Sequence, residues 1–91
     1  MNIQFTQNAW EEFNYWLDID SEVADKIIAQ IKEIKQNPFK GSGKPEPLRH
    51  ELKGYWSRRI TQEHRLVYKV EGKKGDGQTC YIIQCRFHYD G

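Results

Sequence analysis

The sequence predicts an α+β fold in which two N-terminal helices pack on one face of an antiparallel sheet. Two observations support this prediction. Apolar residues recur at helical spacing in the first third of the chain, and runs with alternating apolar residues fill the second half. The chain has 91 residues, a length typical of one small domain, so we expect residues 1–91 to form a single domain.

The N-terminal part begins with a short predicted strand, residues 2–5, followed by a first helix. Thr6 is suited to cap that helix, because its hydroxyl can accept a hydrogen bond from an amide of the first turn. Large apolar residues then recur at helical spacing: Trp10, Phe13, Trp16 and Leu17. We expect these side chains to lie in the core.

A second helix follows, and Asp20 or Ser21 can cap its start. Its apolar stripe consists of Val23, Ile27, Ile31 and Ile34. The helix is expected to end at Asn37, because a residue that precedes proline resists the α conformation.

The middle of the chain changes character. Residues 39–47, FKGSGKPEP, contain two glycines and two prolines and predict an exposed loop that carries Glu46. Strands are expected near residues 54–61, 64–71 and 79–88, with the polar stretch 72–78 as the hairpin loop between the last two.

Charge is segregated along the chain, although the formal net charge is only +1. Residues 1–34 carry two lysines against seven acidic residues, a net charge of −5. Residues 35–69 carry nine basic residues against three acidic ones, a net charge of +6. A basic surface of this kind suits nucleic acid or an acidic protein, but an ordinary solvated surface gives the same count.

Composition also bears on the cellular location, the state of the cysteines and the need for a cofactor. No apolar run is long enough to span a membrane, and the first residues lack the features of a secretory signal, so we expect a cytoplasmic protein. Cys80 and Cys85 are expected on opposite faces of one strand, and therefore as reduced thiols. Together with His50, His64 and His88 they show no zinc-binding spacing, so no metal or other cofactor is predicted.

Alternation along the strands predicts one charged surface. When Ile60 faces the core, Arg59 faces away from it, and the same alternation turns Arg65 to that side in the next strand. The predicted register places Thr61 beside Arg65. Two arginines therefore share the face opposite the helices.

The last strand is expected to extend this surface. We assign its apolar residues to the core: Tyr81, Ile83, Cys85 and Phe87. The intervening Gln84, Arg86 and His88 then face the same way as the two arginines, which makes Arg86 a candidate for RNA binding. This prediction uses alternation alone, so a β-bulge would change it.

The residues of this surface have the side chains needed to cleave RNA without a metal. A base must take the proton of the 2′-hydroxyl, an acid must protonate the leaving 5′-oxygen, and cations must hold the phosphate. Glu46 is the candidate base and His88 the candidate acid. Arg59 and Arg65 can bind phosphate through bidentate hydrogen bonds. Tyr89 can stack on a base or offer its hydroxyl.

Each of these assignments has a simpler alternative. Glu46 can be a solvated loop carboxylate, and His88 a surface residue near the end of the chain. Glu63 is expected in the turn between two strands, where it can pair with an arginine. His64 and Arg58 are predicted on the core side of their strands, which indicates a hydrogen-bonded structural role for His64 and a structural or edge position for Arg58. The corresponding alternative function is a noncatalytic module that binds nucleic acid or an acidic protein.

Two stretches carry a resemblance to a known family. The run NPFKGSGKPEPLRHELKGYWSRRITQEHRLVYKV and the terminal CRFHY resemble the YoeB group of bacterial toxins, within the RelE-like superfamily. The likeness covers nearly the whole chain. It implies a RelE-like microbial RNase fold. It also implies an endoribonuclease, or mRNA interferase, that cleaves translated messenger RNA in the ribosomal A site without a metal cofactor.

The resemblance also implies roles for individual residues. Glu46 matches the general base of the family, Arg65 its phosphate-binding arginine and His88 its general acid. Tyr89 matches the final tyrosine. Further matched positions lie in the site or help to grip RNA: Arg59, Glu63, Lys44 and Arg49. Which of Glu46 and His88 is the true base stays open, because coupled groups can share the proton transfers.

Partners follow from the same resemblance. Toxins of this group are inhibited by a cognate antitoxin, here YefM-like, whose disordered tail folds against the toxin. The pair represses its own operon, so operator DNA is contacted only through the complex. We therefore expect an antitoxin, the ribosome, messenger RNA and a second copy of this chain as partners, and no membrane.

Two features depart from the family pattern. The hairpin loop 72–78 is longer than usual, and residues 90–91 extend past the His-Tyr end. The carboxylate of Asp90 would raise the pKa of His88 or repel RNA.

Overall fold

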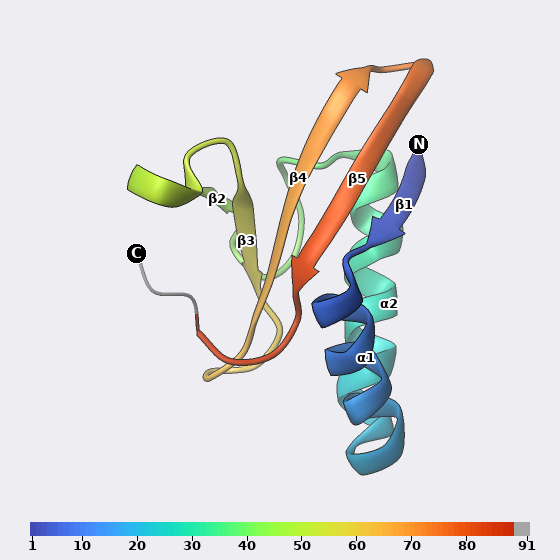
Figure 1. The fold of residues 1–91 in the computed structure, drawn as a ribbon, viewed down its shortest axis with the longest axis vertical. Coiled ribbons are helices and arrows are strands. Elements are labelled where there is room, and N and C mark those ends of the chain that lie inside the picture. Colours follow the sequence, from blue (N-terminus) through green and yellow to red (C-terminus); the bar gives the residue numbers. More distant parts are fainter. Residues whose placement is uncertain (89–91) are drawn as a thin grey trace.

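The computed structural model describes residues 1–88 and shows a five-stranded mixed sheet with two helices on one face (Figure 1). The strand order is β1-β5-β4-β3-β2. In chain order the elements are β1 (Asn2–Phe5), α1 (Gln7–Ile19), α2 (Ser21–Gln36), β2 (Glu46–Pro47), a 3₁₀ turn (His50–Leu52), β3 (Trp56–Arg59), β4 (Arg65–Lys73) and β5 (Asp76–Gln84). Within the described chain, neither helix is long and apolar enough to cross a membrane.

Both helices begin where the sequence predicts. The Thr6 hydroxyl accepts a hydrogen bond from the Ala9 amide at 3.1 Å, and the Asp20 carboxylate accepts one from the Val23 amide at 3.4 Å. These bonds satisfy amides that have no partner within the helix. The second helix ends at Gln36, just before the Asn37-Pro38 pair, as predicted.

The main core lies between the helices and the sheet. Its buried residues are Ala9, Phe13, Trp16, Val23, Ala24, Ile27, Ile34, Ile60, Leu66, Tyr68, Cys80, Ile82 and Cys85. The prediction that Trp10 and Leu17 are core residues is wrong, since they are 49% and 47% exposed. The first helix buries only the stripe that contains Ala9, Phe13 and Trp16, and the other two side chains lie beside it.

The sheet is not purely antiparallel, which corrects the sequence prediction. β1 pairs with β5 in parallel, from Asn2 opposite Thr79 to Phe5 opposite Ile82. The other three pairings are antiparallel. A parallel pair needs a long connection, and the whole chain between these two strands provides it.

The predicted loop 72–78 is also shorter than expected. The strands run to Lys73 and restart at Asp76, which leaves only two residues between them. Gly72 and Gly77 have φ angles of +91° and +70°, so glycine lets the ladder continue through an irregular pairing.

Alternation fails in β5 because of an irregularity. Cys80 and Ile82 face the core, and the register then shifts between Val67 and Tyr68. After that shift Cys85 also faces the core, so the two cysteines share a face instead of lying on opposite ones. Both are free thiols, and burial raises the pKa of each to about 12.

Candidate functional site

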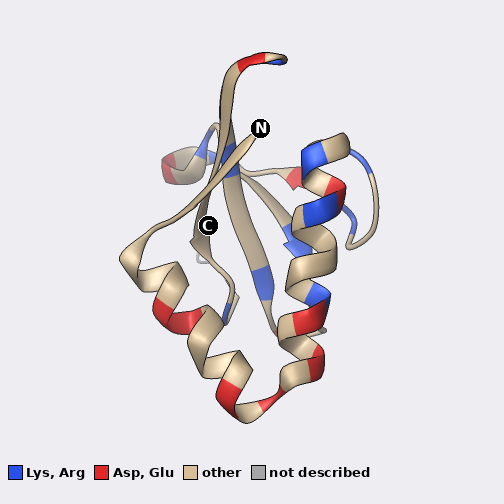
Figure 2. Cartoon of the chain, turned by 90° about the vertical axis from the view of Figure 1, so that its right-hand side faces the viewer, with Lys and Arg blue, Asp and Glu red and all other residues tan. Residues whose placement is uncertain are grey.

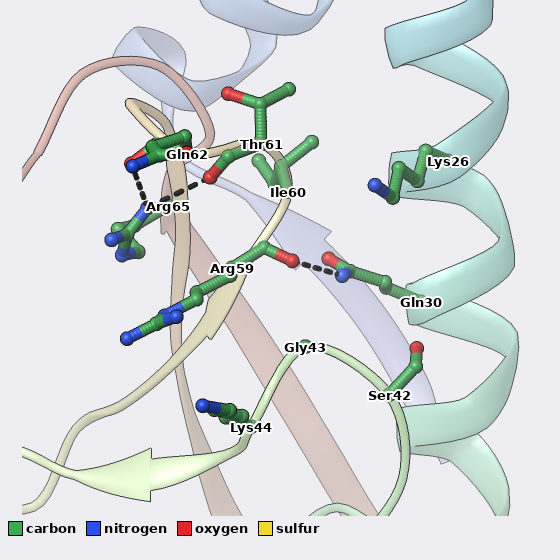
Figure 3. Close-up of a pocket in the computed structure, with 10 residues that line it drawn as sticks. All are labelled: Lys26, Gln30, Ser42, Gly43, Lys44, Arg59, Ile60, Thr61, Gln62 and Arg65. Carbon is green, nitrogen blue, oxygen red and sulfur yellow. Dashed lines mark hydrogen bonds between the residues drawn. The ribbon is translucent and has the colours of Figure 1, made fainter.

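Arg59 and Arg65 are direct cross-strand partners in β3 and β4. The sequence predicted Thr61 opposite Arg65, so the predicted register was wrong by two residues. A shift of two residues leaves each side chain on the same face of the sheet. Directly opposed side chains on an antiparallel pair point to one face, and like charges in that position are destabilising. Both arginine side chains extend to the same side of β3 (Figure 3). The pair is therefore a ready site for an anion.

The backbone of Arg59 is held from two sides. Its amide donates to the Gly43 carbonyl at 2.7 Å, and its carbonyl accepts from Gln30 Nε2 at 2.6 Å. A Cβ at position 43 would lie 2.7 Å from the Arg59 oxygen and 2.8 Å from Gln30 Nε2, and the φ angle there is +80°. Only glycine meets these conditions without strain, so Gly43 helps to fix the position of Arg59.

Arg65 is almost buried and holds the turn between β3 and β4. Its Nη1 donates to the carbonyl oxygens of Thr61 (2.9 Å), Gln62 (3.1 Å) and His64 (3.1 Å). Within the described chain these side-chain bonds involve Nη1 alone, whereas a guanidinium carries five N–H donors. The turn thus orients the group while donors remain for a ligand.

A cavity of about 640 Å³ lies between α2 and the β3–β4 turn. Its lining residues are Lys26, Gln30, Ser42, Gly43, Lys44, Arg59, Ile60, Thr61, Gln62 and Arg65 (Figure 3). Three of the predicted site residues meet there: Lys44, Arg59 and Arg65.

The other seven lining residues were not predicted as site residues, and two of them, Lys26 and Gln30, lie on α2. The sequence does hold a signal for Gln30, because it lies at helical spacing from Ile27 and Ile34. In the structure Gln30 is 2% exposed. A buried polar residue in an apolar stripe indicates a specific partner, here the Arg59 carbonyl.

Glu46 lies on the same face, one row away from the arginine pair. It is exposed in the edge strand β2 and stands opposite Ser57, which in turn stands opposite Val67. Arg59 is two residues beyond Ser57, so it is the diagonal neighbour of Glu46. Diagonal neighbours are about 7–8 Å apart, within reach of long side chains.

Two hydrogen bonds of the Phe87 backbone hold the C-terminal segment beside Arg65. The Arg65 amide donates to the Phe87 carbonyl at 3.0 Å, and the Phe87 amide donates to His64 Nδ1 at 2.7 Å. His64 therefore has the predicted structural role. His88 is exposed directly after this anchored residue. Tyr89 lies outside the described residues.

Other predicted site residues do not join this group. The prediction that Arg86 faces the same way as Arg59 is wrong, because its guanidinium carbon lies 3.6 Å from the ring centroid of Tyr15 on α1. Arg49 is exposed at the start of the 3₁₀ turn, and Glu63 is exposed in the β3–β4 turn. Neither lines the cavity. Within residues 1–88 no group of three or more histidine, cysteine, aspartate or glutamate residues is placed to hold a metal ion.

Arg58 is fully buried and organises the loop that precedes Glu46. Its guanidinium donates to Tyr68 Oη (3.1 Å) and to the carbonyl oxygens of Asn37 (3.1 Å), Pro38 (3.5 Å), Lys40 (2.8 Å) and Ser42 (3.3 Å). Tyr68 Oη donates in turn to the Pro38 carbonyl at 2.6 Å. The structural role predicted for Arg58 is confirmed.

Ionisable groups around Arg58 respond to this arrangement. Hydrogen bonds from the Ser42 hydroxyl and amide lower the pKa of Glu33, whose Oε1 is 3.7 Å from Arg58 Nη1. Burial raises the pKa of Tyr68, so its hydroxyl stays protonated and can donate.

The basic residues are concentrated away from the helix junction. Acidic side chains gather where α1 meets α2, whereas basic ones lie at the other end of α2 and along the strands (Figure 2). The charge segregation seen in the sequence thus becomes a spatial one, with the arginine pair on the basic side.

Comparison with known proteins identifies the family. Residues 5–89 match the YoeB-like toxin of bacterial type II toxin-antitoxin system. Toxin YoeB of Escherichia coli K12 is 44% identical over 89 residues, which cover 98% of this chain and 100% of that protein. The solved YoeB/ParE toxin from Agrobacterium tumefaciens is 47% identical, with a TM-score of 0.92 over 98% of this chain and 100% of that one.

Solved structures also cover assemblies. YoeB from Staphylococcus aureus, 40% identical, has been solved as a dimer and in a heterotetrameric YoeB-YefM complex, with TM-scores of 0.86 and 0.85 over 98% of each chain. The toxin-antitoxin complex RelBE2 from Mycobacterium tuberculosis is 19% identical with a TM-score of 0.70, over 96% of each chain, and shares the fold alone.

The fold and these similarities define the class of protein as the toxin of a bacterial type II toxin-antitoxin system. Within that class, the chain belongs to the YoeB-like family, as its sequence motifs predict.

Proposed function

We propose that this toxin is a ribosome-dependent endoribonuclease that cleaves messenger RNA in the A site by metal-independent acid-base chemistry. The observation that supports this most strongly is the direct cross-strand pair of Arg59 and Arg65. Two cations in that position repel each other, and a bound phosphate would offset the repulsion. Lys44 lines the same cavity and adds a third positive charge.

The reaction needs a base and an acid on either side of that phosphate. Glu46 takes the proton of the 2′-hydroxyl, whose oxygen then attacks phosphorus. The bond from phosphorus to the 5′-oxygen breaks, and His88 gives that oxygen a proton. The products are a 2′,3′-cyclic phosphate and a 5′-hydroxyl. Arg59 and Arg65 stabilise the charge that develops on the phosphate oxygens.

The remaining site residues have supporting roles in this proposal. Tyr89 stacks on a base or offers its hydroxyl. Arg49, beyond β2, and Glu63, in the β3–β4 turn, do not line the cavity and are proposed to contact RNA farther from the cleaved bond. Arg86 is not assigned to RNA, because its guanidinium lies over the Tyr15 ring.

Single-turnover cleavage of a message on programmed ribosomes tests the assignment. We expect Glu46→Gln, Arg65→Ala and His88→Ala to lower the rate about 10²- to 10⁴-fold each. Lys74→Ala is the matched control, since this exposed residue lies in the β4–β5 loop, at the opposite end of β4 from the β3–β4 turn (Figure 1). Undiminished cleavage by the three site variants would refute the proposal. Salt-dependent binding without scission would favour the binding-module alternative.

The chemistry of the fragment ends tests metal independence. A 2′-hydroxyl nucleophile leaves 5′-hydroxyl ends that a kinase can label directly, whereas attack by metal-bound water leaves 5′-phosphate ends. Directly labelled ends support the proposed mechanism. A pH-rate profile then distinguishes the base from the acid. If Glu46 is the base, Glu46→Gln should remove the fall in rate at low pH.

We also propose a YefM-like antitoxin and a second copy of this chain as partners, with operator DNA bound only through the antitoxin complex. The Staphylococcus aureus assemblies support this. An apolar groove between β1 and α2, lined by Ile3, Phe5, Ile28 and Ile31, offers a surface for an antitoxin segment. Light scattering of the purified toxin, alone and with the antitoxin, should give a dimer and a larger complex. A monomer in both samples would contradict the proposal.

A further inference from the structure

A hydrogen bond joins the His64 side chain to the segment that carries His88. His64 Nδ1 accepts a hydrogen bond from the Phe87 amide at 2.7 Å. An imidazole nitrogen accepts a hydrogen bond only when it carries no proton. The contact therefore requires a neutral ring with its hydrogen on Nε2.

The ring is itself fixed by aromatic neighbours. Its centroid lies 4.8 Å from that of Trp16 in an edge-on arrangement, and 6.1 Å from that of Phe87. Trp16 also binds the segment directly, because its indole N–H donates to the Cys85 carbonyl at 2.8 Å. The Cys85 amide donates to Glu12 at 2.9 Å.

At Phe87 the segment is held by backbone bonds more than by the side chain. The Phe87 side chain is 55% exposed, so packing contributes little there. The Phe87 backbone has a φ angle of +68°, a conformation that is unfavourable for a phenylalanine and needs support from its surroundings. Three bonds give that support: the Phe87 amide donates to His64 Nδ1, and the Phe87 carbonyl accepts from the Arg65 amide and from Gln84 Nε2.

We propose that His64 is a positioning residue whose neutral Nδ1 fixes the Phe87 backbone and thereby sets the place of His88 relative to Arg65. The catalytic part of this inference rests on the proposed function. An aromatic ring alone would satisfy the contact with Trp16. The acceptor atom is needed for the backbone bond, and that bond holds the residue directly before His88.

Three substitutions distinguish the role of the hydrogen-bond acceptor of His64 from that of its aromatic ring. His64→Asn places an amide oxygen close to the position of Nδ1, His64→Gln places one near Nε2, and His64→Phe keeps an aromatic ring without an acceptor. We expect His64→Asn to retain kcat within about threefold. The other two should lower kcat about ten- to a hundredfold with KM nearly unchanged, because the catalytic group is misplaced by a small distance.

A structural measurement tests the same contact without relying on cleavage. Amide hydrogen exchange at Phe87, compared with Leu66 in the core of the same variant, should be slow in the wild type and in His64→Asn. It should be at least tenfold faster in His64→Phe and His64→Gln, while exchange at Leu66 stays unchanged. Nitrogen chemical shifts of the His64 ring should report the tautomer with hydrogen on Nε2.

The outcomes can be told apart. Equal exchange at Phe87 in all four proteins, or full kcat in His64→Phe, would overturn the role of His64. A wild-type protein that cleaves nothing would refute the proposed function, while the exchange rates would still decide whether His64 holds the segment.

Discussion

Arg58 and Arg59 are neighbours in β3, yet they differ in almost every physical respect. Arg58 is fully buried, and its guanidinium is surrounded by backbone carbonyls and the Tyr68 hydroxyl. Arg59 is exposed, and its nearest cross-strand neighbour is another arginine. The first uses its donors to hold a loop in place, and the second presents its donors to a cavity. Strand alternation alone gives two identical side chains opposite roles.

The largest expected effect is on stability, from Arg58→Met. This change leaves several partly buried carbonyls and the Tyr68 hydroxyl without their donor, so we expect the free energy of unfolding to fall by about 3–5 kcal/mol. Urea denaturation measures it. Arg59→Met is the matched control on the exposed face, and it should change stability by no more than about 0.5 kcal/mol. Similar losses in both variants would show that the two faces do not differ in this way.

Arg59→Met should instead impair RNA cleavage. Removing one donor to a phosphate in its transition state typically costs about 10²- to 10³-fold in rate. Single-turnover cleavage on programmed ribosomes measures the loss, with Lys74→Met as the control. A rate equal to that of the wild type would remove Arg59 from the proposed site.

Tyr68→Phe tests the buried hydrogen-bond network around Arg58. The hydroxyl accepts from Arg58 and donates to the Pro38 carbonyl, so its removal should cost about 1–2 kcal/mol of unfolding free energy. Cleavage by the folded variant should change little. An unchanged urea midpoint would mean that the Arg58 network does not depend on this hydroxyl.

The smallest expected effect is a pH dependence at Glu33. Its folded-state pKa is lowered from the ordinary value of 4.5, chiefly by hydrogen bonds from Ser42. This contribution to stability is present above the unfolded pKa and is lost as the pH falls through the folded pKa. Glu33→Gln should therefore flatten the decline of stability below about pH 4.5. Urea midpoints at a series of acidic pH values provide the comparison, and identical slopes in both proteins would contradict the prediction.

Much of the fold follows from local patterns in the sequence. The caps at Thr6 and Asp20, the apolar stripe of α2 and the Asn37-Pro38 stop each depend on neighbouring residues, and all were predictable. The parallel placement of β1 was not, because it depends on contacts between opposite ends of the chain.

The candidate site was predictable in part, for a similar reason. Parity turned Arg59 and Arg65 to one face correctly, although the register was two residues off. The same reasoning failed for Arg86, because β5 becomes irregular near Gln84 and the chain then leaves the sheet. The hydrogen bond from Phe87 to His64 joins residues 23 positions apart, and no local sequence pattern predicts it.

The most direct test of the central claim is to map the 5′ ends of fragments that the purified toxin makes on translating ribosomes, with and without His88→Ala. The face that carries Arg59, Arg65 and Glu46 predicts new 5′-hydroxyl ends within the A-site codon for the wild type, and formation of these ends at least about 10²-fold more slowly for the variant. Ribosome binding without new ends, or the same ends at the same rate from His88→Ala, would contradict it.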